Sequence, residues 1–214
     1  KINSETDFVA KNDEFINFAE EVSELTLSNL GKMETLLLSK MKNNKNVQDN
    51  LVSLIAKIGE KISIRRSAFL DDKNTVNFSY THSSLKKNIG KLGVLLSLET
   101  AKEKNEILDF GKQLSMQIAA SAPLSIDKND LDKKIIEKEK EIIKEELKNS
   151  AKDPKIADKI AIGKLNKFIS ENTLLNQEWI IDPKKKVKDV MKEIFGKDKI
   201  IVKKFIRFKV GEGV

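Results

Sequence analysis

A polar stretch near the start of the chain, residues 4–13, carries the side chains best suited to chemistry with a partner. It reads Ser-Glu-Thr-Asp-Phe-Val-Ala-Lys-Asn-Asp, so hydroxyls, carboxylates and an amide surround the single aromatic ring of Phe8. A large ring on a connecting segment is commonly buried in the core of its own domain. The alternative is an exposed ring that inserts into a partner protein. The residue pattern leaves both interpretations of Phe8 open.

Residue types that support covalent or metal-assisted catalysis are scarce in this chain. It has no cysteine, which excludes disulfides, thiolate catalysis and cysteine zinc sites and fits a reducing compartment. The single histidine, His82, cannot form a multi-histidine metal site and is expected on a surface loop. None of the five Gly-Lys dipeptides has the upstream glycine of a phosphate-binding loop. We expect no catalytic site, metal or cofactor, and interpret the chain as a binding protein.

Composition indicates a soluble globular protein, and we expect it in the cytoplasm. The chain has 214 residues, of which 39% are hydrophobic and 34% charged, enough for one or two domains. Its net charge is +7, but the two signs are mixed and no basic stripe with interleaved aromatics is present. No apolar run approaches the ~20 residues of a membrane span. We expect neither a membrane nor direct nucleic-acid binding. Because the first residue is Lys, we also expect sequence upstream.

Hydrophobic periodicity predicts the elements that position Phe8. Residues 2–4 are interpreted as the end of a strand, and Gly59 as the residue that closes a helix. The predicted helices are 13–30, 34–41 and 47–58. Alternating residues predict strands at 62–66, 76–80 and 92–98, with a polar connection at 82–88. Three sequential strands favour an antiparallel meander packed against the helices.

The chain then repeats its first long helix. Residues 105–115 align with residues 13–23, with Glu, Phe and Ser coincident and the apolar positions matched. A Glu-Thr pair precedes both copies, but the spacing from that Glu to the helix Glu is two residues longer in the first copy. If the repeat is real, the first copy carries a small insertion that displays residues 7–9. Chance similarity between two amphipathic helices stays open as an alternative. The repeat predicts an α+β fold of two similar subdomains, residues 1–104 and 105–214, each a small antiparallel sheet with packed helices.

The second subdomain is predicted to contain a helical hairpin at about residues 130–170. Residues 131–150 carry a narrow apolar stripe on a helix otherwise rich in Lys and Glu, and Asp153-Pro154 is a strong helix start. We expect these two helices to project from the body as an antiparallel coiled coil. The other predictions for this half are a strand at 177–181, a helix that starts at Asp182-Pro183 and a strand at 200–210.

Several motifs together resemble the bacterial elongation factor Ts family over essentially the whole chain. They follow the family's order, and the family's small helical N-terminal domain is absent from this sequence. The motifs are Thr6–Asn12, Ile58–Arg66, Ser79–His82, Ile118–Ser121, Lys164–Phe168 and Phe205–Gly213. The resemblance implies a guanine nucleotide exchange factor that promotes GDP release from the GTPase elongation factor Tu and supports translation elongation. It also implies two similar subdomains, the second with a helical hairpin.

The same resemblance implies which residues meet the GTPase. In that family a Thr-Asp-Phe-Val segment enters the GTPase near its magnesium site and displaces the elements that hold the ion. Its Asp and Phe are the intruding pair, and its Thr and Val flank them. By the match, the four are Thr6, Asp7, Phe8 and Val9. Further partner contacts are expected from Lys11 and Asn12. Gln117 stands where family members often carry a histidine that contacts the GTPase, and because glutamine cannot titrate, we expect that contact to be altered.

Two other classes of function stay open at this point. An RNA- or ribosome-associated accessory protein would use the basic surface, and its RNA binding would weaken steeply with salt. A purely structural scaffold would bury Phe8 in its own core. Homodimerisation is compatible with each of these functions, and exposure of Phe8 distinguishes the exchange factor from the scaffold.

Overall fold

The structure is a computed structural model that describes residues 1–86, 88–148 and 154–213. It combines helices with two small antiparallel sheets, which confirms the predicted α+β class. The chain forms two compact units, each assembled from separate segments. Unit 1 comprises Lys1–Lys73, Ser79–Leu95 and Ile206–Val214, and unit 2 comprises Asn74–Phe78 and Leu96–Phe205. The predicted division into residues 1–104 and 105–214 stays a prediction.

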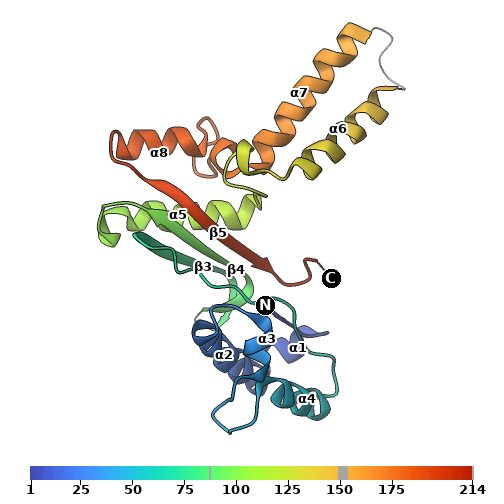
Figure 1. The fold of residues 1–214 in the computed structure, drawn as a ribbon, viewed down its shortest axis with the longest axis vertical. Helices are drawn as coiled ribbons and strands as arrows, with labels where there is room; N and C mark the ends of the chain where they lie inside the picture. The colour runs from blue at the N-terminus through green and yellow to red at the C-terminus, as the bar shows by residue number, and fades with distance from the viewer. Residues whose placement is uncertain (87, 149–153, 214) are drawn as a thin grey trace. The chain divides into compact units, whose positions relative to one another are not determined.

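Unit 1 contains helices at the three predicted places, together with a short helix in the Phe8 segment that was not predicted. Its first elements are β1 (Ile2–Asn3), α1 (Asp7–Ala10), α2 (Asp13–Ser28), α3 (Met33–Leu38) and α4 (Val47–Ile58), drawn in blue to teal in Figure 1. Gly59 closes α4 with a left-handed φ of 78°, as expected of a glycine just past a helix end. The core joins the inward faces of these helices: Val9, Phe15, Ile16, Phe18, Val22, Leu36, Met41, Val47, Leu51, Leu54 and Ile62.

The strands pair differently from the predicted meander. β2 (Ser63–Ile64) pairs with β1, with Ile64 opposite Ile2, so the predicted strand at 62–66 is not the first strand of the larger sheet. That sheet has the order β3 (Thr75–Lys86), β4 (Ile89–Glu99), β5 (Ile201–Lys209). The predicted connection at 82–88 was also wrong, because β3 continues to Lys86. A strand with one face in water can carry many polar residues, so the polarity of this segment was not sufficient evidence for a loop.

Unit 2 packs its helices around an aromatic cluster. Its elements are η1 (Lys104–Ile107), α5 (Leu108–Ser121), η2 (Lys128–Asp130), α6 (Lys133–Lys148), α7 (Pro154–Asn172), η3 (Leu174–Asn176) and α8 (Val187–Phe195). The ring of Phe110 on α5 stacks against Trp179 at a centroid distance of 6.1 Å and meets Phe195 edge-on at 5.0 Å. Phe110 is the repeat counterpart of Phe18, and both are buried. The aligned positions therefore serve the same packing role in α2 and α5.

Helices α6 and α7 lie alongside one another in opposite directions (Figure 1). Ile143 of α6 is buried, and an ion pair joins Glu146 of α6 to Lys164 of α7. At the base of the pair, the Asn176 side chain donates to Asp127 Oδ1 at 2.7 Å and so links the segments that flank the two helices. The predicted helix start at Asp153 lies outside the described residues. Coiled-coil packing and projection of the hairpin stay predictions.

The predicted strand at 177–181 and the predicted helix start at Asp182-Pro183 were both wrong. Trp179 N donates to Lys185 O at 2.8 Å and Val187 N to Gln177 O at 3.0 Å, so the segment folds back on its own loop. Only an isolated bridge between Glu178 and Lys186 results, and α8 begins at Val187. Alternating burial of Gln177 and Trp179 imitates strand periodicity without a neighbouring strand.

Candidate partner-binding site

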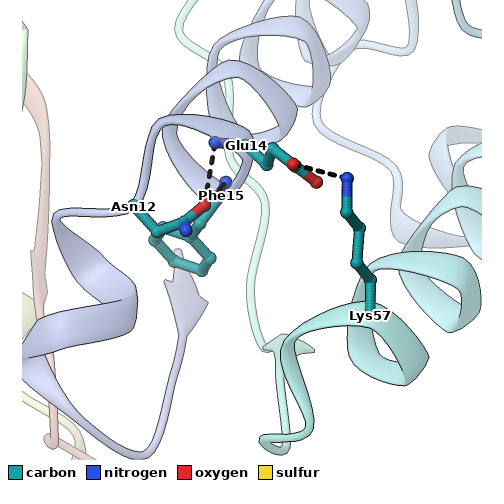
Figure 2. Close-up of polar contacts among 4 residues, drawn as sticks. All are labelled: Asn12, Glu14, Phe15 and Lys57. Carbon is teal, nitrogen blue, oxygen red and sulfur yellow. Dashed lines mark hydrogen bonds and ion pairs between the residues drawn. The ribbon is translucent and has the colours of Figure 1, made fainter.

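The Phe8 segment folds as a single helical turn, α1, with a capped helix start on each side. Thr6 is the N-cap of α1, and its Oγ1 accepts a hydrogen bond from Val9 N at 3.4 Å. Lys11 N donates to Phe8 O at 3.1 Å and closes the turn. Asn12 then caps α2, because its Oδ1 accepts from Glu14 N at 2.9 Å and from Phe15 N at 3.2 Å (Figure 2). The backbone of this segment is therefore held in place.

Adjacent residues of α1 have opposite environments. The Phe8 side chain is 81% exposed, whereas Val9 is 6% exposed and belongs to the unit 1 core. Val9 anchors the turn by burial, and the turn presents Phe8 to solvent. The expected exposure of Phe8 is confirmed, and the alternative in which Phe8 is a core residue is wrong.

The charged residues of the segment are only loosely engaged. Lys11 Nζ lies 3.8 Å from Asp7 Oδ2, and both side chains are more than half exposed. An exposed pair at this spacing contributes at most about 1 kcal/mol and is easily exchanged for other partners. Asp7 can therefore accept hydrogen bonds from an incoming protein without a large cost.

Two links that sequence reasoning missed tie this segment and α2 to α4 and the residues after it. The carboxylate of Glu60 accepts hydrogen bonds from Thr6 Oγ1 at 2.9 and 3.0 Å and from Thr6 N at 3.1 Å. Lys57 Nζ on α4 donates to Glu14 Oε1 at 2.6 Å and connects α4 to α2 (Figure 2). Glu60 lies in one of the motifs that carry the family resemblance, but 54 positions separate it from Thr6, so no local pattern showed their contact.

Gln117 is placed away from any surface. Its side chain is 0% exposed, and its Nε2 donates to Ser121 Oγ, Gln177 Oε1 and Glu178 O at 3.0–3.2 Å. Its Oε1 accepts from Ile180 N at 2.8 Å. Gln117 thus cross-links α5 to the 177–180 segment inside unit 2. In this structure the side chain has no free face for the partner contact that the resemblance implied, because Gln177 and the backbone of Glu178 and Ile180 occupy its amide.

His82 lies on β3 rather than on the predicted loop, and it is exposed as expected. Its Nδ1 is 2.9 Å from the Tyr80 hydroxyl. Over residues 1–86, 88–148 and 154–213, no group of three or more His, Cys, Asp or Glu side chains is placed to hold a metal ion. Across these same ranges, no helix has the length and apolar character that crossing a bilayer requires.

Comparison with known proteins places the Phe8 segment in a family context. A family model described as Elongation factor TS matches residues 5–212. Elongation factor Ts of Zymomonas mobilis is 37% identical over 217 residues, which cover 100% of this chain and 70% of that protein. The proteins of the same name from Gluconobacter oxydans and Rickettsia prowazekii are 35% and 37% identical, with the same coverage of both chains. The chain belongs to the elongation factor Ts family.

Proposed function

We propose that this chain releases GDP from elongation factor Tu by inserting Phe8 and Asp7 beside the magnesium site of the GTPase. As a member of the elongation factor Ts family, it is a nucleotide exchange factor for that GTPase in translation elongation. The observation that carries the insertion mechanism is the contrast between Phe8 and Val9. A ring that is 81% exposed stands on a turn whose next side chain is 6% exposed and buried in the core.

Nucleotide release by this route requires no contact with the base or the ribose. Mg²⁺ neutralises much of the phosphate charge, so disturbing its coordination weakens GDP binding strongly. A factor that binds the nucleotide-free GTPase more tightly than the loaded form must weaken nucleotide binding by the same ratio. The exchange factor then acts through protein contact alone, and Asp7 offers acceptors to donors that the displaced elements leave behind.

The ordered turn supplies binding energy at low entropic cost. Full burial of a phenylalanine side chain at an interface contributes about 1.5–3 kcal/mol. Because capping and the buried Val9 already hold α1, little backbone freedom is lost when Phe8 meets its partner. We place this exchange in the cytoplasm, and we propose that Thr6 and Val9 support the intruding pair while Lys11 and Asn12 lie at the edge of the contact.

The test is release of fluorescently labelled GDP from elongation factor Tu as the concentration of this protein is increased. Phe8→Ala should raise the concentration needed for half-maximal release by about 10- to 100-fold, since 1.4 kcal/mol corresponds to tenfold. Leu38→Ala is the matched control, because Leu38 is an apolar side chain of unit 1 that is 73% exposed. A wild-type chain that fails to accelerate release, or a Phe8→Ala variant that matches wild type, would show the insertion mechanism to be wrong.

A further inference from the structure

Glu60 follows the C-terminal end of α4 and holds the start of the Phe8 turn. Its carboxylate accepts from two Thr6 donors: the hydroxyl, whose single hydrogen is shared between Oε1 and Oε2 at 2.9 and 3.0 Å, and the backbone N–H, at 3.1 Å from Oε2. Hydrogen bonds to an ionised acceptor are stronger than those between neutral groups. Glu60 is partly buried, while its hydrogen bonds to Thr6 are open to solvent.

The direction of Glu60 follows from the end of α4. Gly59 adopts a left-handed φ of 78° and donates its N–H to Ile55 O at 2.8 Å, which turns the chain sharply out of the helix. The next residue is therefore carried across to Thr6. A second link runs the other way, since Lys61 N donates to Glu5 Oε2 at 3.2 Å. The pairs Glu5-Thr6 and Glu60-Lys61 thus exchange backbone-to-carboxylate hydrogen bonds.

The turn that these links hold is too short to be stable alone. An isolated helix of four residues is strongly disfavoured, because nucleation fixes several backbone angles in return for few hydrogen bonds. We call the hydrogen bonds between Thr6 and the Glu60 carboxylate the Glu60 clamp. Thr6 Oγ1 donates its hydrogen to Glu60 and accepts from Val9 N, so the cap of α1 and the Glu60 clamp share one hydroxyl. Loss of the Glu60 carboxylate frees that hydroxyl to rotate away from the cap.

We infer that Glu60 is a positioning residue for nucleotide exchange, which keeps Phe8 in the orientation that enters the GTPase. This inference rests on the proposed function of Phe8. Glu60 acts through Thr6 and α1 rather than by contact with the partner. The apparent affinity of a binding-competent conformer falls in proportion to its population, so a loosened turn weakens productive binding.

The prediction is a shift in concentration dependence with an unchanged maximal rate. Glu60→Ala should raise the concentration for half-maximal GDP release about three- to tenfold, because the clamp is partly solvent-exposed. The release rate at saturation should stay within about twofold, since the partner selects the ordered turn once enough factor is present. Glu60→Gln keeps an acceptor oxygen for Thr6 and should fall between wild type and Glu60→Ala. Glu20→Gln on the exposed side of α2 is the charge-matched control.

Combination with other variants separates positioning from general stability. Thr6→Val removes the hydroxyl that both donates to Glu60 and caps α1, so it should shift the half-maximal concentration at least as far as Glu60→Ala does. With Phe8 already replaced by Ala, the further change Glu60→Ala should have almost no effect, because the ring that it positions is gone. An additive double variant, or a Glu60→Ala variant equal to wild type while Phe8→Ala is impaired, overturns the inference. Failure of Phe8→Ala to impair release overturns the proposed function instead.

Discussion

At the scale of single residues, two neighbours divide the work of the candidate site. Phe8 and Val9 are consecutive apolar residues of the same turn, yet the first faces solvent and the second lies in the core. A residue that contributes to packing and a residue that contributes to binding should respond differently to truncation. Phe8→Ala removes an exposed side chain, whereas Val9→Ala opens a small cavity under α1.

The two truncations should differ in their effect on stability but have similar effects on function. Val9→Ala should lower the free energy of unfolding by about 1–2 kcal/mol, and Phe8→Ala should change it by less than about 0.5 kcal/mol. Urea unfolding followed by circular dichroism measures both. Both variants should weaken GDP release, Val9→Ala by loosening the turn and Phe8→Ala by removing the ring. Equal stability losses would contradict the buried role of Val9.

Residue-scale features were predictable from the sequence where their causes are local. The predicted start of a helix at Asp13 and the closing role of Gly59 depend on residues within one helical turn, and the structure has both helix boundaries at these positions. The Glu60 clamp and the burial of Gln117 depend on partners 54 and about 60 positions away. Neither periodicity nor composition carries information about such distant partners. The family resemblance marked Phe8 as functional, but exposure was the property that the structure had to supply.

At the scale of elements, the repeated helix shows how two similar patterns acquire different constraints. Gly111 of α5 aligns with Ala19 of α2, and helix propensity alone favours alanine at both. A Cβ added at Gly111 would lie 2.4 Å from the Phe78 ring, which is buried. The contact exists only in unit 2, where β3 begins beside α5. The sequence pattern could not distinguish a glycine needed for this close approach from one that is merely tolerated.

The close contact between Gly111 and Phe78 predicts that a Gly→Ala substitution has opposite effects on stability in α5 and in α7. Gly111→Ala should destabilise the protein by about 1–3 kcal/mol, because the buried ring must move to admit the methyl group. Gly163→Ala in α7 should stabilise it by about 0.5–1 kcal/mol, since a Cβ there meets no atom of the described residues within 4 Å. Thermal unfolding of the two variants beside wild type measures the signs. Stabilisation by both would show that helix propensity outweighs the Phe78 contact.

At the scale of the whole molecule, unit 1 depends on the last residues of the chain. Ile206–Val214 belongs to this unit although the rest of it ends at Leu95. Val210 N donates to Lys91 O at 2.8 Å, and the Arg66 guanidinium lies 4.6 Å from the centroid of the Phe208 ring. Arg65 also donates to Gly213 O at 2.9 Å. Periodicity predicted β5 itself, but its partners could not be read from the sequence because pairing across more than a hundred residues leaves no local trace.

Removal of residues 206–214 should therefore destabilise unit 1, although the other segments of that unit end at Leu95. We expect the melting temperature of unit 1 to fall by at least about 10 °C, because several kcal/mol of strand pairing and packing are lost and 1 kcal/mol corresponds to about 4–8 °C in a unit of this size. The single tryptophan, Trp179, lies in unit 2, so its fluorescence reports that unit while circular dichroism reports the whole chain. On heating, the truncated chain should lose part of its circular dichroism signal at a lower temperature than that of the Trp179 fluorescence transition. A chain that ends at Val210 keeps the strand and should lose less. Coincident transitions at the wild-type temperature would show that unit 1 is complete without its C-terminal strand.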